Sequence, residues 1–256
     1  MTWELHLGDC IEGMRAMADK SVDHVICDPP YEKEAHAQGR RLSRSWQEQK
    51  ADVHHIVEHQ ITYRPITDAE RVACAEQYAR LAKRWIIVFC QSEAAILWRD
   101  ALVEAGALYK RFGVYWKLDA QPQYSGDGPG VGWEAVVICH GLPKKGRTAW
   151  NAGGKCARWD AAADARFGQK LAVDGQKPLS LMRQLVSDFT NPGELILDSH
   201  AGSGTTGAAC IELGRRFVGF ELDKKHHTIA TKRLQETSRQ EQMFKPQKQE
   251  QRRLAL

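Results

Sequence analysis

Four consecutive residues, Asp28-Pro29-Pro30-Tyr31, combine groups that can hold and orient a flat polar ligand. They follow the apolar run 22–27, which predicts a buried strand. Prolines donate no backbone hydrogen bond and fix φ, so the strand must end here in a stiff, extended segment. Because α/β sheets bind ligands at the carboxyl ends of their strands, the tetrapeptide indicates a reaction site. The alternative is a strand that ends in a turn with a packed tyrosine.

The segment 194–207 is the second stretch whose residue types indicate a ligand site. An apolar strand ends at Asp198, and the glycine turn G-S-G-T-T-G at 202–207 leads directly into a helix. Glu221 follows Gly202 by nineteen positions, near the spacing of an acid that holds a ribose. Glycine lets the backbone approach a ligand, and a carboxylate accepts hydrogen bonds from ribose hydroxyls.

The glycine turn by itself fits more than one cofactor. A NAD- or flavin-dependent oxidoreductase matches G-x-G-x-x-G, whereas a P-loop is excluded because no Gly-Lys-Ser or Gly-Lys-Thr follows. Asp198 would repel a pyrophosphate but can face the ammonium or sulfonium of S-adenosylmethionine (SAM). A nucleotide oxidoreductase also has no use for the tetrapeptide at Asp28, so SAM is the better match.

The two stretches together resemble those of the amino-group DNA methyltransferases, which carry a DPPY-type tetrapeptide and use SAM. The likeness covers most of 5–234, and the tetrapeptide precedes the glycine turn, as in the permuted class called beta. Ser199 and His200 stand where the family usually has proline and phenylalanine. The resemblance implies the catalytic residues Asp28, Pro29, Pro30 and Tyr31. The implied cofactor contacts are Asp9, Cys10, Lys177, Asp198, His200, Gly202, Gly204, Thr205, Thr206 and Glu221.

The resemblance implies methyl transfer from SAM to the N6 amine of a flipped adenine in double-stranded DNA. Cytosine N4 and a glutamine amide are alternative targets, but relatives acting there usually begin the tetrapeptide with Ser or Asn, so Asp28 favours adenine. Two less favoured alternatives are a NAD-dependent oxidoreductase and a DNA-binding relative that has lost catalysis. The resemblance also admits a homodimer.

Basic residues indicate where DNA would bind. The net charge of +4 favours an acidic partner, and the basic residues within 141–170 face only two acids. This segment also contains Trp150 and Trp159, and we expect it to lie outside the core as a nucleic-acid contact region; the alternative is a surface flap. The predicted DNA contacts are Arg40, Arg41, Arg44, Lys144, Lys145, Arg147, Lys155 and Arg158.

The elements that must position these residues indicate one elaborated α/β domain over 1–256. We expect a doubly wound, mostly parallel, seven-stranded Rossmann-like methyltransferase sheet with an inserted DNA-recognition region. The strands 108–117 and 133–139 should form an antiparallel pair, because the segment between them is too rich in Gly and Pro for a crossover helix. We also expect a mobile loop at 32–66, a target-recognition region at 118–170, a helix from 224 to about 235 and a flexible basic tail at 237–256.

The remaining patterns bear on metals and location. The seven cysteines include no C-x-x-C pair, and His55 and His59 lack the glutamate of H-E-x-x-H, so no metal is expected. The cysteines are typical of reduced core residues in a cytoplasmic protein. No run of about eighteen apolar residues predicts a membrane segment.

Overall fold

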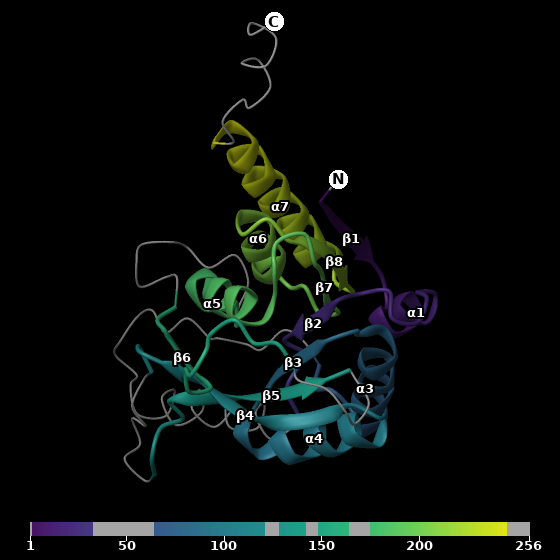
Figure 1. Ribbon diagram of the computed structural model, residues 1–256, viewed down its shortest axis with the longest axis vertical. Coiled ribbons are helices and arrows are strands. Elements are labelled where there is room, and N and C mark those ends of the chain that lie inside the picture. The colour runs from purple at the N-terminus through teal and green to yellow at the C-terminus, as the bar shows by residue number, and fades with distance from the viewer. Residues whose placement is uncertain (1, 33–63, 121–127, 142–147, 164–174, 245–256) are drawn as a thin grey trace, which may run out of the picture.

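The computed structural model of the protein describes residues 2–32, 64–120, 128–141, 148–163 and 175–244. Within these ranges the chain forms one mixed sheet in the order β1-β8-β7-β2-β3-β5-β4-β6 (Figure 1). The strands are β1 Trp3–Leu7, β2 His24–Cys27, β3 Trp85–Cys90, β4 Leu108–Lys117, β5 Trp133–His140, β6 Arg158–Ala161, β7 Leu195–Asp198 and β8 Arg216–Glu221. Neighbours from β1 to β3 are parallel, whereas β5 is antiparallel to both β3 and β4. The expected mostly parallel α/β sheet with an antiparallel pair is therefore confirmed.

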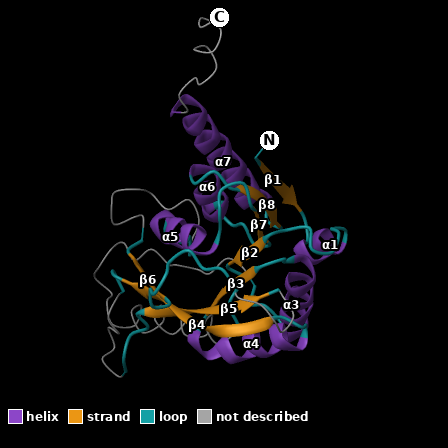
Figure 2. Cartoon of the chain, viewed as in Figure 1, coloured by secondary structure: helices purple, strands orange, loops and turns teal. Residues whose placement is uncertain are grey.

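Helices cover both faces of the sheet (Figure 2). The helices are α1 Cys10–Arg15, α3 Asp68–Leu81, α4 Ala95–Glu104, α5 Leu179–Phe189, α6 Thr205–Glu212 and α7 Lys224–Phe244, with a short 3₁₀ helix at Ser92–Ala94. Residues of α1, α3 and α4 pack into the apolar core on one face, and residues of α5, α6 and α7 pack into the core on the other. This is the doubly wound arrangement that the sequence predicts.

The local sequence explains where these elements begin and why the central strands are buried. Thr67 accepts a hydrogen bond from the Glu70 N–H while the Glu70 carboxylate accepts from the Thr67 N–H, so the predicted capping box of α3 is present. Every residue of β2 and β3 is buried, as expected for continuous apolar strands covered on both faces.

The sheet has eight strands among the described residues, where we expected seven. The additional strand is β6, which pairs in parallel with β4 and lies in the segment predicted to be outside the core. Trp159 of β6 is completely buried, packs against Phe189 and donates from Nε1 to the Asp188 carboxylate at 2.7 Å. Few aliphatic residues surround this tryptophan in the sequence, so its contacts with α5 were not apparent.

The last helix is longer than expected. We predicted that it would end near residue 235, but α7 continues to Phe244. The side chain of Thr237 is buried, and Trp3 donates from Nε1 to Ser238 Oγ at 2.8 Å. The hydrogen bond from Trp3 in β1 holds a part of α7 whose polar composition predicts fraying. Residues 245–256 of the expected tail lie outside the described residues.

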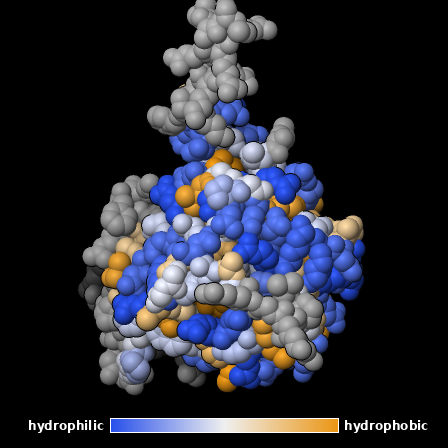
Figure 3. Space-filling view, in the orientation of Figure 1, coloured by the Kyte–Doolittle hydropathy of each residue, from blue (hydrophilic) through white to orange (hydrophobic). Residues whose placement is uncertain are grey.

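The face of the molecule seen in Figure 3 is mostly hydrophilic, with hydrophobic residues in small groups. Such a distribution is typical of a surface in contact with water. Of the helices in the described ranges, none is long and apolar enough to cross a membrane.

Candidate active site

Four acidic residues gather where the parallel strands end. Asp28 follows β2, Asp198 ends β7, Glu221 ends β8, and Asp9 lies two residues after β1. The strands are neighbours in the order β1-β8-β7-β2, with Leu7 paired to Glu221 and Asp198 paired to Gly219. The two motifs that are far apart in the sequence therefore share one edge of the sheet, where α/β proteins bind ligands.

Lys177 forms an ion pair with the first of these acids. Its Nζ donates to Asp28 Oδ2 at 2.5 Å and lies 3.2 Å from the Tyr31 hydroxyl. Burial would lower the pKa of Lys177, but the carboxylates of Asp28 and Glu134 outweigh it and raise the pKa. Lys177 is therefore a fixed positive charge beside the DPPY tetrapeptide.

Glu134 is a site residue that the sequence analysis missed. It lies at the second position of β5, and Oε2 accepts from the Tyr31 hydroxyl at 2.7 Å and lies 3.2 Å from Lys177 Nζ. Burial would raise its pKa, but Lys177 and Lys117 outweigh it and hold the pKa at about 2. The available signal was a single acid inside the otherwise apolar run 133–139.

The Asp28 carboxylate is satisfied on one side only. Oδ2 binds Lys177, whereas Oδ1 is buried and has no hydrogen-bond partner in the described parts of the chain. Burial raises the pKa of Asp28, and the Lys177 ammonium opposes that shift. A buried acceptor without a donor is costly, so Oδ1 is an acceptor whose hydrogen-bonding capacity the described residues leave unused.

The other residues of the tetrapeptide surround this acceptor. Pro29 is buried, and Pro30 and Tyr31 are partly exposed. The Tyr31 hydroxyl is fixed by Glu134, and Lys177 Nζ lies 5.2 Å from the centroid of the Tyr31 ring. The Lys177 ammonium thus lies against the Tyr31 ring, and the bond to Glu134 fixes the Tyr31 hydroxyl.

The glycine turn depends on two close approaches. Gly204 has a φ of 77° and precedes α6, and a Cβ there would lie 3.1 Å from the Ala230 Cβ. A Cβ on Gly207 would lie 2.7 Å from Leu234 Cδ2 and 2.9 Å from Phe217 Cε1. Glycine at these positions allows the left-handed turn and the tight packing of α6 on α7 and the sheet.

Glu221 braces the same turn from the next strand. Oε2 accepts from the Gly202 N–H and Oε1 accepts from the Asp223 N–H, each at 2.8 Å. Each carboxylate oxygen can accept a second hydrogen bond, so two acceptor positions remain for ligand hydroxyls. Accepting from both N–H groups requires a carboxylate at the end of β8.

Asp198 and Asp9 occupy the ends of the two flanking strands. Burial raises the pKa of Asp198 to about 6, although hydrogen bonds from Thr206 and the His200 N–H oppose the shift. Asp9 is the N-cap of α1, since Oδ1 accepts from the N–H groups of Ile11 at 2.7 Å and Glu12 at 3.1 Å. The cap uses one carboxylate oxygen of Asp9 and leaves the second oxygen for other partners.

His200 and Cys10 face one another across this edge. Their Nε2 and Sγ atoms are 3.6 Å apart, and His200 Nδ1 lies 2.9 Å from Ser199 Oγ. Thr205 also belongs to the predicted set, but its hydroxyl accepts from Arg233 Nη1 at 2.9 Å. Thr205 therefore has a structural partner of its own.

The predicted DNA contacts are only partly described. Lys155 forms an ion pair with Asp188 at 2.6 Å, and Arg158 pairs with Asp160 at 2.7 Å. Outside the described residues lie Arg40, Arg41, Arg44, Lys144, Lys145 and Arg147. The positive charge of Lys155 and that of Arg158 are thus each paired with a neighbouring carboxylate.

Comparisons with known proteins agree with this geometry. A family model described as DNA methylase matches residues 147–232, which include Lys177, the glycine turn and Glu221. The chain is 25% identical to the type II methyltransferase M.HinfI of Haemophilus influenzae over 249 residues, covering 90% of this chain and 67% of that protein.

Two solved structures have the same fold. The M1.HpyAVI–SAM complex has a TM-score of 0.65 and 23% identity, with coverage of 91% of this chain and 100% of that chain. The cytosine-N4-specific PvuII DNA methyltransferase has a TM-score of 0.64 and 14% identity, with coverage of 94% and 93%. These likenesses confirm the expected Rossmann-like methyltransferase sheet.

Proposed function

We propose that this chain is an amino-group DNA methyltransferase of the N6/N4 class, and that it transfers a methyl group from SAM to N6 of a flipped adenine in duplex DNA. The observation that carries the choice of chemistry is Asp28 Oδ1, a buried acceptor that no described residue pairs with. An amino group of a base supplies the donor that this oxygen lacks.

The target amine needs help because its lone pair is delocalised into the base. Asp28 Oδ1 accepts one N–H and the Pro29 carbonyl accepts the other, which turns the lone pair toward the methyl donor. Lys177 favours the ionised form of Asp28 and so opposes the rise in its pKa that burial causes, and Tyr31 stacks on the base that has left the duplex. Catalysis then consists of positioning and electrostatic stabilisation, without a covalent enzyme adduct.

The acids at the other strand ends fit SAM as the methyl donor. When bound, SAM supplies an electrophilic methyl group on a sulfonium. Glu221 has two acceptor positions left for the ribose hydroxyls, and the buried Asp198 offers a carboxylate to a cationic group. Asp9 lies at the end of β1 on the same edge and would complete the adenosine side of the site.

Cytosine N4 is the second candidate target. The likeness to the cytosine-N4-specific PvuII enzyme favours it, and the chemistry of an exocyclic amine is the same. Asp28 favours adenine instead, because N4 relatives usually begin the tetrapeptide with Ser. Identification of the methylated base separates the two.

The direct test measures single-turnover methyl transfer from isotope-labelled SAM to duplex DNA. Asp28→Ala should bind SAM normally and transfer methyl about 10²–10³-fold more slowly, since that is the usual effect of removing one pre-positioned transition-state group. Asp19→Ala, at an exposed aspartate that precedes the same strand, is the matched control and should transfer normally. A folded Asp28→Ala enzyme with normal speed would refute the assigned role.

A further inference from the structure

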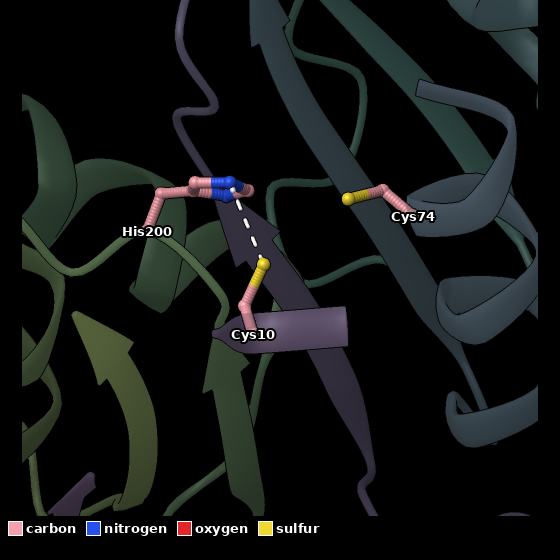
Figure 4. A group of neighbouring side chains, drawn as sticks. All are labelled: Cys10, Cys74 and His200. Atoms are coloured by element: carbon pink, nitrogen blue, oxygen red, sulfur yellow. Dashed lines mark hydrogen bonds between the residues drawn. The ribbon is translucent and has the colours of Figure 1, made fainter. Parts of the chain in front are cut away.

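Three potential metal ligands from separate parts of the chain meet beside the glycine turn. Cys10 is the first residue of α1, Cys74 lies in α3, and His200 follows β7 (Figure 4). Their ligand atoms all lie within 4.8 Å of one another. We propose that these three residues form a binding site for a thiophilic divalent cation, and that the preferred ion is Zn²⁺.

The distance between Cys10 Sγ and His200 Nε2 fits two ligands of one tetrahedral zinc ion. Bonds of about 2.3 Å to sulfur and about 2.0–2.1 Å to nitrogen, at the tetrahedral angle, separate the two ligand atoms by about 3.5 Å. Cys10 Sγ and His200 Nε2 are 3.6 Å apart, and the side chains point toward one another in Figure 4. A zinc ion therefore needs little movement of these two residues.

The hydrogen bonds behind His200 prepare its Nε2 for a metal. Nδ1 lies 2.9 Å from Ser199 Oγ, which in turn lies 2.6 Å from the Tyr78 hydroxyl. When Nδ1 carries the proton and donates to Ser199, Nε2 keeps its lone pair on the side of Cys10. Metal-binding histidines are commonly oriented by such a bond from the second ring nitrogen.

The charge and the exposure of the three residues also suit zinc. Two thiolates balance the charge of Zn²⁺, so an occupied site buries no net charge. Binding forms two Zn–S bonds and one Zn–N bond and releases the two thiol protons to solvent. Cys74 is buried, whereas Cys10 and His200 are partly exposed, so the cation enters from their side. Water or a small ligand can fill the fourth position.

A bound cation has a consequence for the methyl donor, which rests on the proposed function. Cys10 and His200 are two of the proposed SAM contacts, whereas Cys74 is not. Zinc in this site would therefore compete with SAM for Cys10 and His200 and weaken SAM binding. Because zinc also needs Cys74, which SAM does not contact, replacing Cys74 should remove the effect of zinc and leave SAM binding intact. Zinc-dependent inhibition is the regulation that this arrangement allows.

The site is tested by titrating the reduced, metal-free protein with Zn²⁺, and with Co²⁺ as a spectroscopic probe. We expect one equivalent per chain and the absorption of a tetrahedral cobalt–thiolate centre. Cys74→Ser and His200→Phe should each weaken binding at least about 100-fold, and Ser199→Ala about tenfold, as for a lost outer-shell bond. Cys156→Ser, at an exposed cysteine, is the control and should bind normally.

Several results would overturn the proposal. The proposal fails if the reduced protein binds no Zn²⁺, or if Cys74→Ser and His200→Phe bind Zn²⁺ with the affinity of the wild type. It also fails if Cys156→Ser no longer binds the one equivalent of Zn²⁺. Calorimetry with SAM tests the consequence separately: zinc should raise the SAM Kd of the wild type but not of Cys74→Ser. An unchanged SAM Kd in the wild type would refute the competition. If the metal-free protein does not bind SAM, the proposed function is refuted, whereas the zinc site is still judged by the Zn²⁺ titration alone.

Discussion

Glu221→Gln tests both the bracing of the glycine turn by Glu221, seen in the structure, and the proposed binding of the SAM ribose. The glutamine side chain has the same shape, but it places an NH₂ group against the N–H of Gly202 or of Asp223, each now 2.8 Å from a carboxylate oxygen. On the proposed function, a ribose hydroxyl of bound SAM would also lose a charged acceptor. A hydrogen bond to a charged group contributes about 1.5–3 kcal/mol, so SAM affinity should fall about 10- to 150-fold.

Calorimetric titration with SAM measures this loss, and thermal unfolding without ligand measures the loss of bracing in the turn. Glu212→Gln is the matched control, because it removes a carboxylate from α6 that pairs with Arg183 instead. The control should bind SAM like the wild type. If folded Glu221→Gln also binds SAM with wild-type affinity, Glu221 does not hold the ribose.

Three further outcomes are expected. Lys177→Met should move the acidic limb of the kcat/KM profile to higher pH, because Lys177 opposes the rise in the pKa of Asp28 that burial causes; an unmoved limb contradicts this. Gly207→Ala should cost about 1–3 kcal/mol of stability and lower Tm by about 2–12 °C, since its Cβ would meet Leu234 Cδ2 at 2.7 Å. Its control, Gly154→Ala, places Cβ in open space and should leave Tm unchanged. Reversing Lys144, Lys145 and Arg147 to Glu should weaken DNA binding and lower its salt slope by about one unit per lost phosphate contact, without changing SAM affinity; an unchanged salt slope in a binding titration rules these residues out as phosphate contacts.

The sequence predicted those parts of the site that depend on local residue patterns. The two prolines after Asp28 and the glycines at 202–207 have strong backbone requirements, and each motif follows an apolar strand. The ends of the strands could therefore be placed before the order of the sheet was known. Parallel pairing then brings Asp28, Asp198 and Glu221 to one edge.

Contacts between distant segments could not be predicted in this way. Glu134 reaches Tyr31 because β5 returns antiparallel to β3, a pairing that the sequence analysis did not foresee. Trp159 is buried because α5 packs over β6. Cys74 meets Cys10 and His200 only through the packing of α3, so no spacing in the sequence indicated the cluster.

The most direct test of the central claim is nucleoside mass spectrometry of DNA from cells that express the protein. The wild type should produce N6-methyladenine, and Asp28→Ala should not, although it still binds SAM. Sequencing of the modified positions in the same DNA gives the recognition site. N4-methylcytosine in place of N6-methyladenine would contradict the adenine assignment, and unmodified DNA from cells with folded, SAM-binding wild-type protein would contradict the proposed activity.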